Sequence, residues 1–238
     1  MLSIDRGYVG VVKLLMKEKL VDPSIENNHA IQHYSTYGPV EIVKLLLDDP
    51  RVDPTVDNNY PIRWSCRNGE LEVVKLLLQD ERIDPSDQKN YAIKEASFYG
   101  HISIVELLMK HPKVDPSDDN NSAIVSACLL VHIEVAKLLL RDRRVDPSVK
   151  ENFSIVVACE NGQMEIIKLL LQDSRVDPSI KNNSIFKHAC RDGLIEVVKI
   201  LLQDKRVDPT ADDNEAMKMA MSNGRTDIVN LLLESINK

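Results

Sequence analysis

Four cysteines are the residues of this chain best suited to chemistry, because thiolates bind zinc and can form disulfides. They are Cys66, Cys128, Cys159 and Cys190, at successive intervals of 62, 31 and 31 residues. Thiolates that share one zinc must each lie about 2.3 Å from it, and a disulfide requires Cα atoms within about 7 Å of each other. Equivalent positions on stacked helices lie about 8–10 Å apart, so cysteines at such intervals generally meet neither requirement. We interpret them as small buried apolar residues.

Other residue types of catalytic interest are scattered as well. His29 and His33 lie four residues apart and could face one side of a helix, but no third ligand with suitable spacing follows. The acidic run at residues 118–120 lacks the glycine and the final glutamate of a calcium loop. No phosphate-binding glycine loop and no Ser/His/Asp or Cys/His arrangement stands out. The sequence therefore predicts that the protein is not an enzyme and has no cofactor and no metal site. An enzyme or metalloprotein that uses these cysteines and histidines stays as an alternative, and metal analysis of the purified protein would test it.

The interval between the cysteines belongs to a repeat that runs through the chain. An Asp-Pro pair occurs seven times, each 31 residues after the previous one. A unit copied without insertion or deletion is typical of a solenoid, in which each repeat packs on its neighbours. We predict a single array over residues 1–238, with about seven full units and an N-terminal half-unit. The aspartates of the seven pairs are Asp22, Asp53, Asp84, Asp115, Asp146, Asp177 and Asp208.

Each unit is predicted to contain a short first helix that ends at a glycine. In the unit from Val145 to Arg175, this helix begins near Phe153 and ends before Gly162. Glycine just past a helix adopts the left-handed conformation without a Cβ penalty, so the column is interpreted as a C-cap. Val131 interrupts the column, at an expected cost of about 1–2 kcal/mol if the backbone there stays left-handed. The column consists of Gly7, Gly38, Gly69, Gly100, Gly162, Gly193 and Gly224.

A longer second helix is predicted to follow at once. Its apolar residues recur at helical spacing, and a Glu and a Lys three residues apart, such as Glu165 and Lys168, indicate a solvated outer face. Small residues in the middle of the first helix would let neighbouring helices approach closely. These are Ser65, Ala96, Ala127, Ala158, Ala189 and Ala220.

The link between units carries the Asp-Pro pair and then an asparagine. Asp followed by Pro suits the first two positions of a type I turn. The asparagine lies one or two residues before the first helix, where it could cap that helix or hold a left-handed turn. Both interpretations are structural. The column is Asn28, Asn59, Asn90, Asn121, Asn152, Asn183 and Asn214.

The glycine after the first helix, the Glu-Val-Val-Lys-Leu-Leu-Leu pattern of the second and the aspartate-containing turn together resemble the ankyrin repeat. The first helix occupies the place of that family's Thr-Pro-Leu-His-x-Ala motif, although only Pro61 keeps the proline. The resemblance implies an all-α solenoid of helix-turn-helix units that binds proteins and has no chemistry of its own. A unit of 31 residues is shorter than the usual ankyrin repeat of about 33, so we expect shortened or absent β-hairpin fingers. A tetratricopeptide array is disfavoured by the short first helix.

Composition and charge limit the kinds of partner that the protein is expected to bind. The formal net charge of −7 argues against nucleic acid, because binding to phosphates needs a basic face. No run approaches the roughly 20 apolar residues that span a bilayer, and the N-terminus lacks the apolar run of a signal peptide. We expect an intracellular, cytoplasmic monomer that binds another protein and neither nucleic acid nor membrane.

The columns that vary between repeats lie on the first helix and just before it. In ankyrin-like stacks this side lines the concave groove, and seven of the ten aromatic residues fall in these columns. Exposed aromatics concentrate at binding surfaces. Basic residues in early and late repeats flank an apolar centre, which predicts an anchor site for a helix or extended segment with acidic ends. The predicted partner-binding residues are Tyr60, Arg63, Trp64, Arg67, Tyr91, Lys94, Phe98, Tyr99, Val125, Leu129, Phe153, Val156, Lys187 and Arg191.

Two other interpretations stay open. Several of these side chains could simply pack against neighbouring repeats. The chain could also be a structural spacer or a fragment of a larger multidomain ankyrin protein with no binding role of its own. The N-terminal half-unit favours this slightly, because a first helix that ends at Gly7 would have to begin before Met1.

Overall fold

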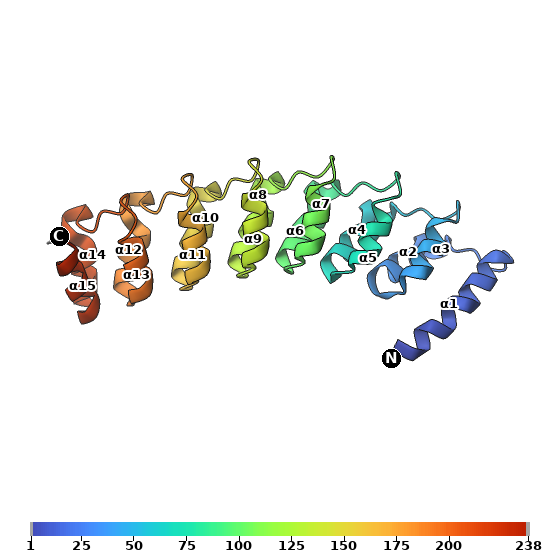
Figure 1. The fold of residues 1–238 in the computed structure, drawn as a ribbon, viewed down its shortest axis with the longest axis horizontal. Coiled ribbons are helices and arrows are strands. Elements are labelled where there is room, and N and C mark those ends of the chain that lie inside the picture. The colour runs from blue at the N-terminus through green and yellow to red at the C-terminus, as the bar shows by residue number, and fades with distance from the viewer. Residues whose placement is uncertain (1, 237–238) are drawn as a thin grey trace. The chain divides into compact units, whose positions relative to one another are not determined.

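Helices make up all the regular structure in the computed structural model, which describes residues 2–236, with side chains from residue 9 onward. No strand occurs in this described range, which confirms the expected all-α solenoid with its β-hairpin fingers shortened or absent. Contacts divide the chain into two compact units, Met1–Ala123 and Ile124–Lys238, which are described one at a time. Figure 1 shows that helices follow one another in pairs within each unit, joined by extended links. None of the described helices has both the length and the apolar content needed to cross a bilayer.

The N-terminal unit begins with a single helix, α1 (Leu2–Lys17), and continues with helix pairs. Its pairs are α2 (Ile25–Tyr37) with α3 (Val40–Leu47), α4 (Val56–Asn68) with α5 (Leu71–Leu77), and α6 (Asp87–Phe98) with α7 (Ile102–Met109). Helix α8 (Asp118–Leu129) starts in this unit, and the boundary between the units falls inside it. Buried apolar residues such as Ile62, Val74 and Ile93 form the core between successive pairs.

The C-terminal unit repeats the same arrangement. After α9 (Ile133–Leu140) come α10 (Val149–Glu160) with α11 (Met164–Leu171), α12 (Ile180–Asp192) with α13 (Ile195–Leu201), and α14 (Ala211–Ser222) with α15 (Thr226–Ile236). The first helix begins near Phe153, as predicted, once the left-handed turn at the start of α10 is set apart from it. The prediction of a longer second helix was wrong, because α11 spans only 8 residues, about the length of the right-handed part of α10.

This left-handed turn opens the first helix of each repeat from α2 onward. In α4 it comprises Asp57, Asn58 and Asn59, with φ values of 50°, 58° and 56°. Each non-glycine residue in this region costs about 1–2 kcal/mol, and left-handed residues normally occur singly. Three in succession therefore require compensating contacts. An asparagine of this column is the last residue of each left-handed turn. Of the two roles considered, capping the helix or holding a left-handed turn, the asparagine therefore has the second.

The compensation comes from hydrogen bonds between one repeat and the next. The Oδ1 atom of Asn59, which is 6% exposed, accepts a bond of 2.9 Å from the backbone N–H of Asp84. Its Nδ2 donates to Asp87 Oδ2 at 2.8 Å. The same Oδ1 bond recurs 25 residues onward from Asn28 and Asn90 in the N-terminal unit, and from Asn152 and Asn183 in the C-terminal unit.

The Asp-Pro pair forms the predicted turn, and an arginine ties it to the preceding repeat. In each link the aspartate Oδ1 accepts from the backbone N–H and the hydroxyl of the Ser or Thr two residues on, as Asp84 does from Ser86. Arg82 pairs with Asp80 and donates to the carbonyl of Val52 at 3.0 Å. Arg175 repeats the carbonyl contact on Val145 in the C-terminal unit. Successive repeats are thus joined by polar connectors as well as by apolar packing.

The glycine column behaves as predicted at five positions and differently at two. Gly69, Gly100, Gly162, Gly193 and Gly224 have positive φ. Val131, which replaces glycine, keeps the left-handed backbone with φ 61°. Gly38 was predicted wrongly, since its φ of −102° and ψ of 172° are extended because the next residue is Pro39. Gly7 was also predicted wrongly, because it lies inside α1 and caps no helix.

Candidate functional site

The cysteines are arranged for packing. All four are buried, and burial raises the pKa of their thiols, to about 12 for Cys128, Cys159 and Cys190. The imidazole rings of His29 and His33 stack with centroids 5.9 Å apart. Across the described residues, no group of three or more His, Cys, Asp or Glu side chains could hold a metal ion. The described structure thus offers no support for the metalloprotein alternative.

Aromatic and cationic side chains form a connected cluster on α4 and α6 of the N-terminal unit, which we call the α4–α6 face. The rings of Tyr60 and Trp64 lie 5.2 Å apart between centroids, one helical turn from each other. The Arg67 guanidinium lies between two rings, 4.8 Å from the centroid of Trp64 and 4.9 Å from that of Tyr99. The ring of Phe98 lies 5.0 Å from that of Tyr99. Phe98 is 41% exposed and Tyr99 39%, so the rings form part of the surface.

Another ring of this face, that of Tyr91, lies close to cations of both helices. The Arg63 guanidinium lies 5.2 Å from its centroid and the Lys94 ammonium 5.6 Å. Arg63 also donates to the carbonyls of Asp57 and Asn58 in its own left-handed turn, at 2.7 Å each. The side chains of the face therefore hold one another in fixed positions.

Most of the predicted basic residues are paired with carboxylates. Arg67 lies 3.1 Å from Glu95, and Lys94 lies 2.9 Å from Asp119. In the C-terminal unit Lys187 pairs with Asp212, and Arg191 pairs with its neighbour Asp192 at 2.7 Å. Lys94 and Lys187 each reach an aspartate 25 residues onward, in the left-handed turn of the next repeat. These ion pairs neutralise positive charge that the sequence pattern predicted to be available for binding a partner.

The predicted apolar centre lies in the C-terminal unit. Leu129 and Phe153 are 41% and 39% exposed, and Val125 and Val156 are half-buried. Neighbouring repeats therefore do not bury this group completely. The remaining predicted residues, Tyr60, Arg63, Trp64, Arg67, Tyr91, Lys94, Lys187 and Arg191, are all half-buried.

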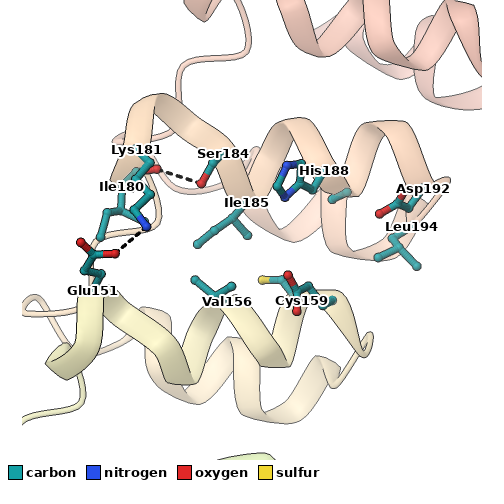
Figure 2. A pocket seen from close by; sticks show the side chains of 12 residues that line it. Glu151, Val156, Cys159, Ile180, Lys181, Ser184, Ile185, His188, Asp192 and Leu194 are labelled. Atoms are coloured by element: carbon teal, nitrogen blue, oxygen red, sulfur yellow. Dashed lines mark hydrogen bonds and ion pairs between the residues drawn. The ribbon is translucent and has the colours of Figure 1, made fainter.

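A pocket of about 210 Å³ lies beside this apolar group, between α10 and α12. Figure 2 shows Ile185 of α12 pointing toward Val156 of α10, with the Glu151–Lys181 ion pair at one end and Asp192 and Leu194 at the other. The floor is buried and the rim is exposed. Among the lining residues, only Val156 was predicted from the sequence to bind a partner. The signal that could have found the pocket is Ser184, a small residue in a column that holds Tyr60, Tyr91 and Phe153 in other repeats.

The family can now be stated from the fold, the repeat and a direct comparison. The model of ankyrin repeats in three copies matches residues 1–89, 62–151 and 155–238. These matches cover almost the whole sequence, so the chain belongs to the ankyrin repeat family. Repeats of this family generally mediate protein–protein interaction and are typically not catalytic. The search of curated proteins gave no match.

Solved structures include a chain of similar fold. It belongs to the structure of the Bd0816 predatory endopeptidase from Bdellovibrio bacteriovorus in complex with the immunity protein Bd3460. The match has a TM-score of 0.54 and 19% sequence identity, and it covers 73% of this chain and 96% of that chain. At this identity the likeness concerns the fold alone.

Proposed function

We propose that the protein is a non-enzymatic interaction module that binds another protein through the exposed side of its first helices, with the α4–α6 face as the main contact. The observation that carries the proposal is the cluster of contacting side chains of Tyr60, Trp64, Arg67 and Tyr99 on α4 and at the C-terminal end of α6. Large rings held in place lose little conformational entropy on binding, which is why Trp, Tyr and Arg are common at interface hot spots.

The charges on this unit favour a partner other than the one that the sequence pattern suggests. Arg67 and Lys94 are neutralised by Glu95 and Asp119. The N-terminal unit carries 20 Asp and Glu residues against 14 Lys and Arg, so its formal charge is −6. A segment with acidic ends would meet little free positive charge there. We infer a partner that contributes apolar and aromatic side chains and is neutral or basic, and not a nucleic acid.

Capture experiments with matched variants test the proposal. The wild-type chain, a Trp64→Ala/Tyr99→Ala variant and a Glu72→Ala/Lys75→Ala control would be immobilised and exposed to a lysate of the cells that express the protein. The control changes an exposed ion pair on α5, on the outer second helix. Circular dichroism would first establish that all three are folded.

We expect at least one protein that binds the wild type and the control and is lost from the Trp64/Tyr99 variant. Retention of every captured protein by that variant would place recognition elsewhere on the chain. A parallel Leu129→Ala/Phe153→Ala variant asks whether the apolar group of the C-terminal unit takes part. Capture of no protein by the wild type would favour the structural spacer.

A further inference from the structure

The pocket between α10 and α12 has the dimensions of a receptor for one side chain. Its volume of about 210 Å³ is below the range of roughly 300–1,000 Å³ typical of small-molecule sites. Its floor contains Cys159, Ile185 and Ala189, which are at most 4% exposed. A cavity of this size with a buried apolar floor and an exposed rim fits a single large side chain inserted from outside.

Ser184 is a small residue among those that line the pocket. Position 184 belongs to the column of Tyr60, Tyr91 and Phe153, where other repeats place a ring. Ser184 fills little of that space, and its hydroxyl donates to the carbonyl of Ile180 in its own helix. The repeat at α12 thus lacks the ring that three other repeats supply for themselves.

The surroundings of Tyr91 indicate how an aromatic ring would lie in the pocket. Each residue around Tyr91 has a counterpart around Ser184, three repeats later in the sequence. The Tyr91 ring contacts Arg63 of the preceding first helix, and the counterpart of Arg63 is Val156 on the pocket wall. The pKa of Tyr91 is raised, first by burial and then by the charge of Glu95, with Arg67 also close to the hydroxyl. The counterparts of Glu95 and Arg67 are His188 and Glu160, which both line the pocket.

The charges around the pocket favour a group that donates a hydrogen bond. Three carboxylates line it, those of Glu151, Glu160 and Asp192, against the single ammonium of Lys181. Glu151 is paired with Lys181, and Asp192 with Arg191. Glu160 is exposed, and the charge of Arg191 acts on it, but its carboxylate has no hydrogen bond or close ion pair within the described part of the chain. A donor at the tip of an inserted ring would meet this carboxylate.

We propose that this pocket receives a tyrosine side chain of a partner protein, with the ring between Val156 and Ile185 and the phenol O–H donating to Glu160. The partner's ring then completes the column that Ser184 leaves open. The site belongs to the C-terminal unit and shares no residue with the α4–α6 face, so it is tested independently of the proposed function.

Methyl NMR of the full chain with single-residue probes tests this assignment. The probes are N-acetyl-L-tyrosinamide, N-acetyl-L-phenylalaninamide and N-acetyl-L-lysinamide. We expect the tyrosine probe to shift the methyl signals of Val156, Ile185 and Leu194, with a dissociation constant on the order of 1 mM for a ligand of so few atoms. The phenylalanine probe should bind about tenfold more weakly, because it lacks a hydrogen bond to a charged acceptor.

Three variants determine whether the probe occupies the pocket itself. Ser184→Tyr fills the pocket with the residue that the array itself uses at Tyr60 and Tyr91, and should abolish the shifts. Ser122→Tyr makes the same change in the same column of the N-terminal unit and should leave probe binding intact. Glu160→Gln alters an exposed side chain, so it should fold normally and lose most of the preference for tyrosine over phenylalanine.

Three results would overturn the assignment. They are shifts that map away from the pocket, equal binding of the phenylalanine or lysine probe to the wild type, and undiminished binding to a folded Ser184→Tyr variant. If Ser184→Tyr does not fold, Glu160→Gln decides, because an unchanged preference for tyrosine in that variant would exclude Glu160 as the acceptor.

Discussion

The side chain of Asn90 holds the next repeat at two points. Its Oδ1 accepts a hydrogen bond of 2.9 Å from the backbone N–H of Asp115, and its Nδ2 donates one of 2.9 Å to Asp118 Oδ2. Asn90 is 5% exposed and has left-handed φ of 54°. Asparagine tolerates this conformation better than most residues and also fills both hydrogen-bonding roles, so one residue meets two requirements.

Asn90→Ala should lower the free energy of unfolding by about 2–3 kcal/mol, from two lost hydrogen bonds and the cost of alanine in the left-handed region. Asn90→Gly removes the same hydrogen bonds but adopts the left-handed conformation freely, so it should cost less than alanine. Urea denaturation of both variants gives the two values. Equal costs would mean that the conformation of the turn contributes nothing measurable.

Val131→Gly should stabilise the protein, by up to about 1 kcal/mol, because valine is strained in the left-handed region and its 41% exposed side chain loses little burial. The converse change is Gly162→Val. A Cβ added at Gly162 meets no atom within 4 Å, so its cost of about 1–2 kcal/mol would come from the backbone alone. Thermal unfolding of both variants checks this, and a destabilised Val131→Gly would show that the valine side chain contributes more than its strain costs.

Asp49 should make folding sensitive to acid. Its ion pair with Arg51, at 2.7 Å, lowers the pKa of Asp49 to about 2, chiefly through the side-chain hydrogen bond from Arg51. A carboxyl group whose pKa is lowered on folding contributes its full stabilisation of the folded state at pH values above its unfolded pKa of about 3.9. This contribution is lost as the pH falls through the pKa of the folded state. Asp49→Asn should therefore reduce stability near pH 6, with the difference from wild type shrinking between about pH 4 and pH 2.

Urea denaturation of wild type and Asp49→Asn at several pH values measures that difference. Glu72→Gln, which alters an exposed carboxylate on α5, is the control and should match wild type closely. A difference between wild type and Asp49→Asn that stays constant down to about pH 2 would contradict the assigned role of the Arg51 contact.

Leu139→Ala should weaken the C-terminal unit first. Leu139 is fully buried in α9, and truncation of such a residue costs about 2–5 kcal/mol. The buried thiols report on each unit, since Cys66 lies in the N-terminal unit and Cys159 and Cys190 lie in the C-terminal one. With increasing urea, iodoacetamide should modify Cys159 and Cys190 of the variant at a lower concentration than in wild type, with a smaller change at Cys66. A common shift for all three would indicate tight coupling along the array.

Much of the fold could be predicted from the columns that stay constant. A glycine just past a helix predicts a left-handed cap, and five glycines have positive φ, as does Val131 in their column. The prediction is wrong at Gly38 for a reason that is also local, because Pro39 restricts the residue before it to extended backbone. The run of three left-handed residues could not be predicted, since it depends on bonds that Asn59 and its counterparts make with the next repeat.

The candidate site was predicted less well, because each variable residue was judged within its own repeat. The rings of Tyr60, Trp64 and Tyr99 do lie on one surface. Lys94 and Lys187 were assigned to a partner, yet each pairs with an aspartate 25 residues onward. The asparagine connectors use the same offset, so aligning each column with the column 25 residues ahead would have revealed these pairs. The pocket at Ser184 could have been found only by noticing that this repeat has a serine in a column where other repeats have an aromatic residue.

The uniform offset of the asparagine connectors also bears on how such a chain can change length. Each connector links a residue to a partner 25 positions ahead, whichever repeat it belongs to. Excision of one complete period of 31 residues would bring an equivalent aspartate to the same distance from the asparagine, whereas loss of a single residue in the link would break the register. Gene duplication and deletion in whole periods are therefore the changes that this architecture tolerates, and the number of repeats can evolve while the connections between them stay the same.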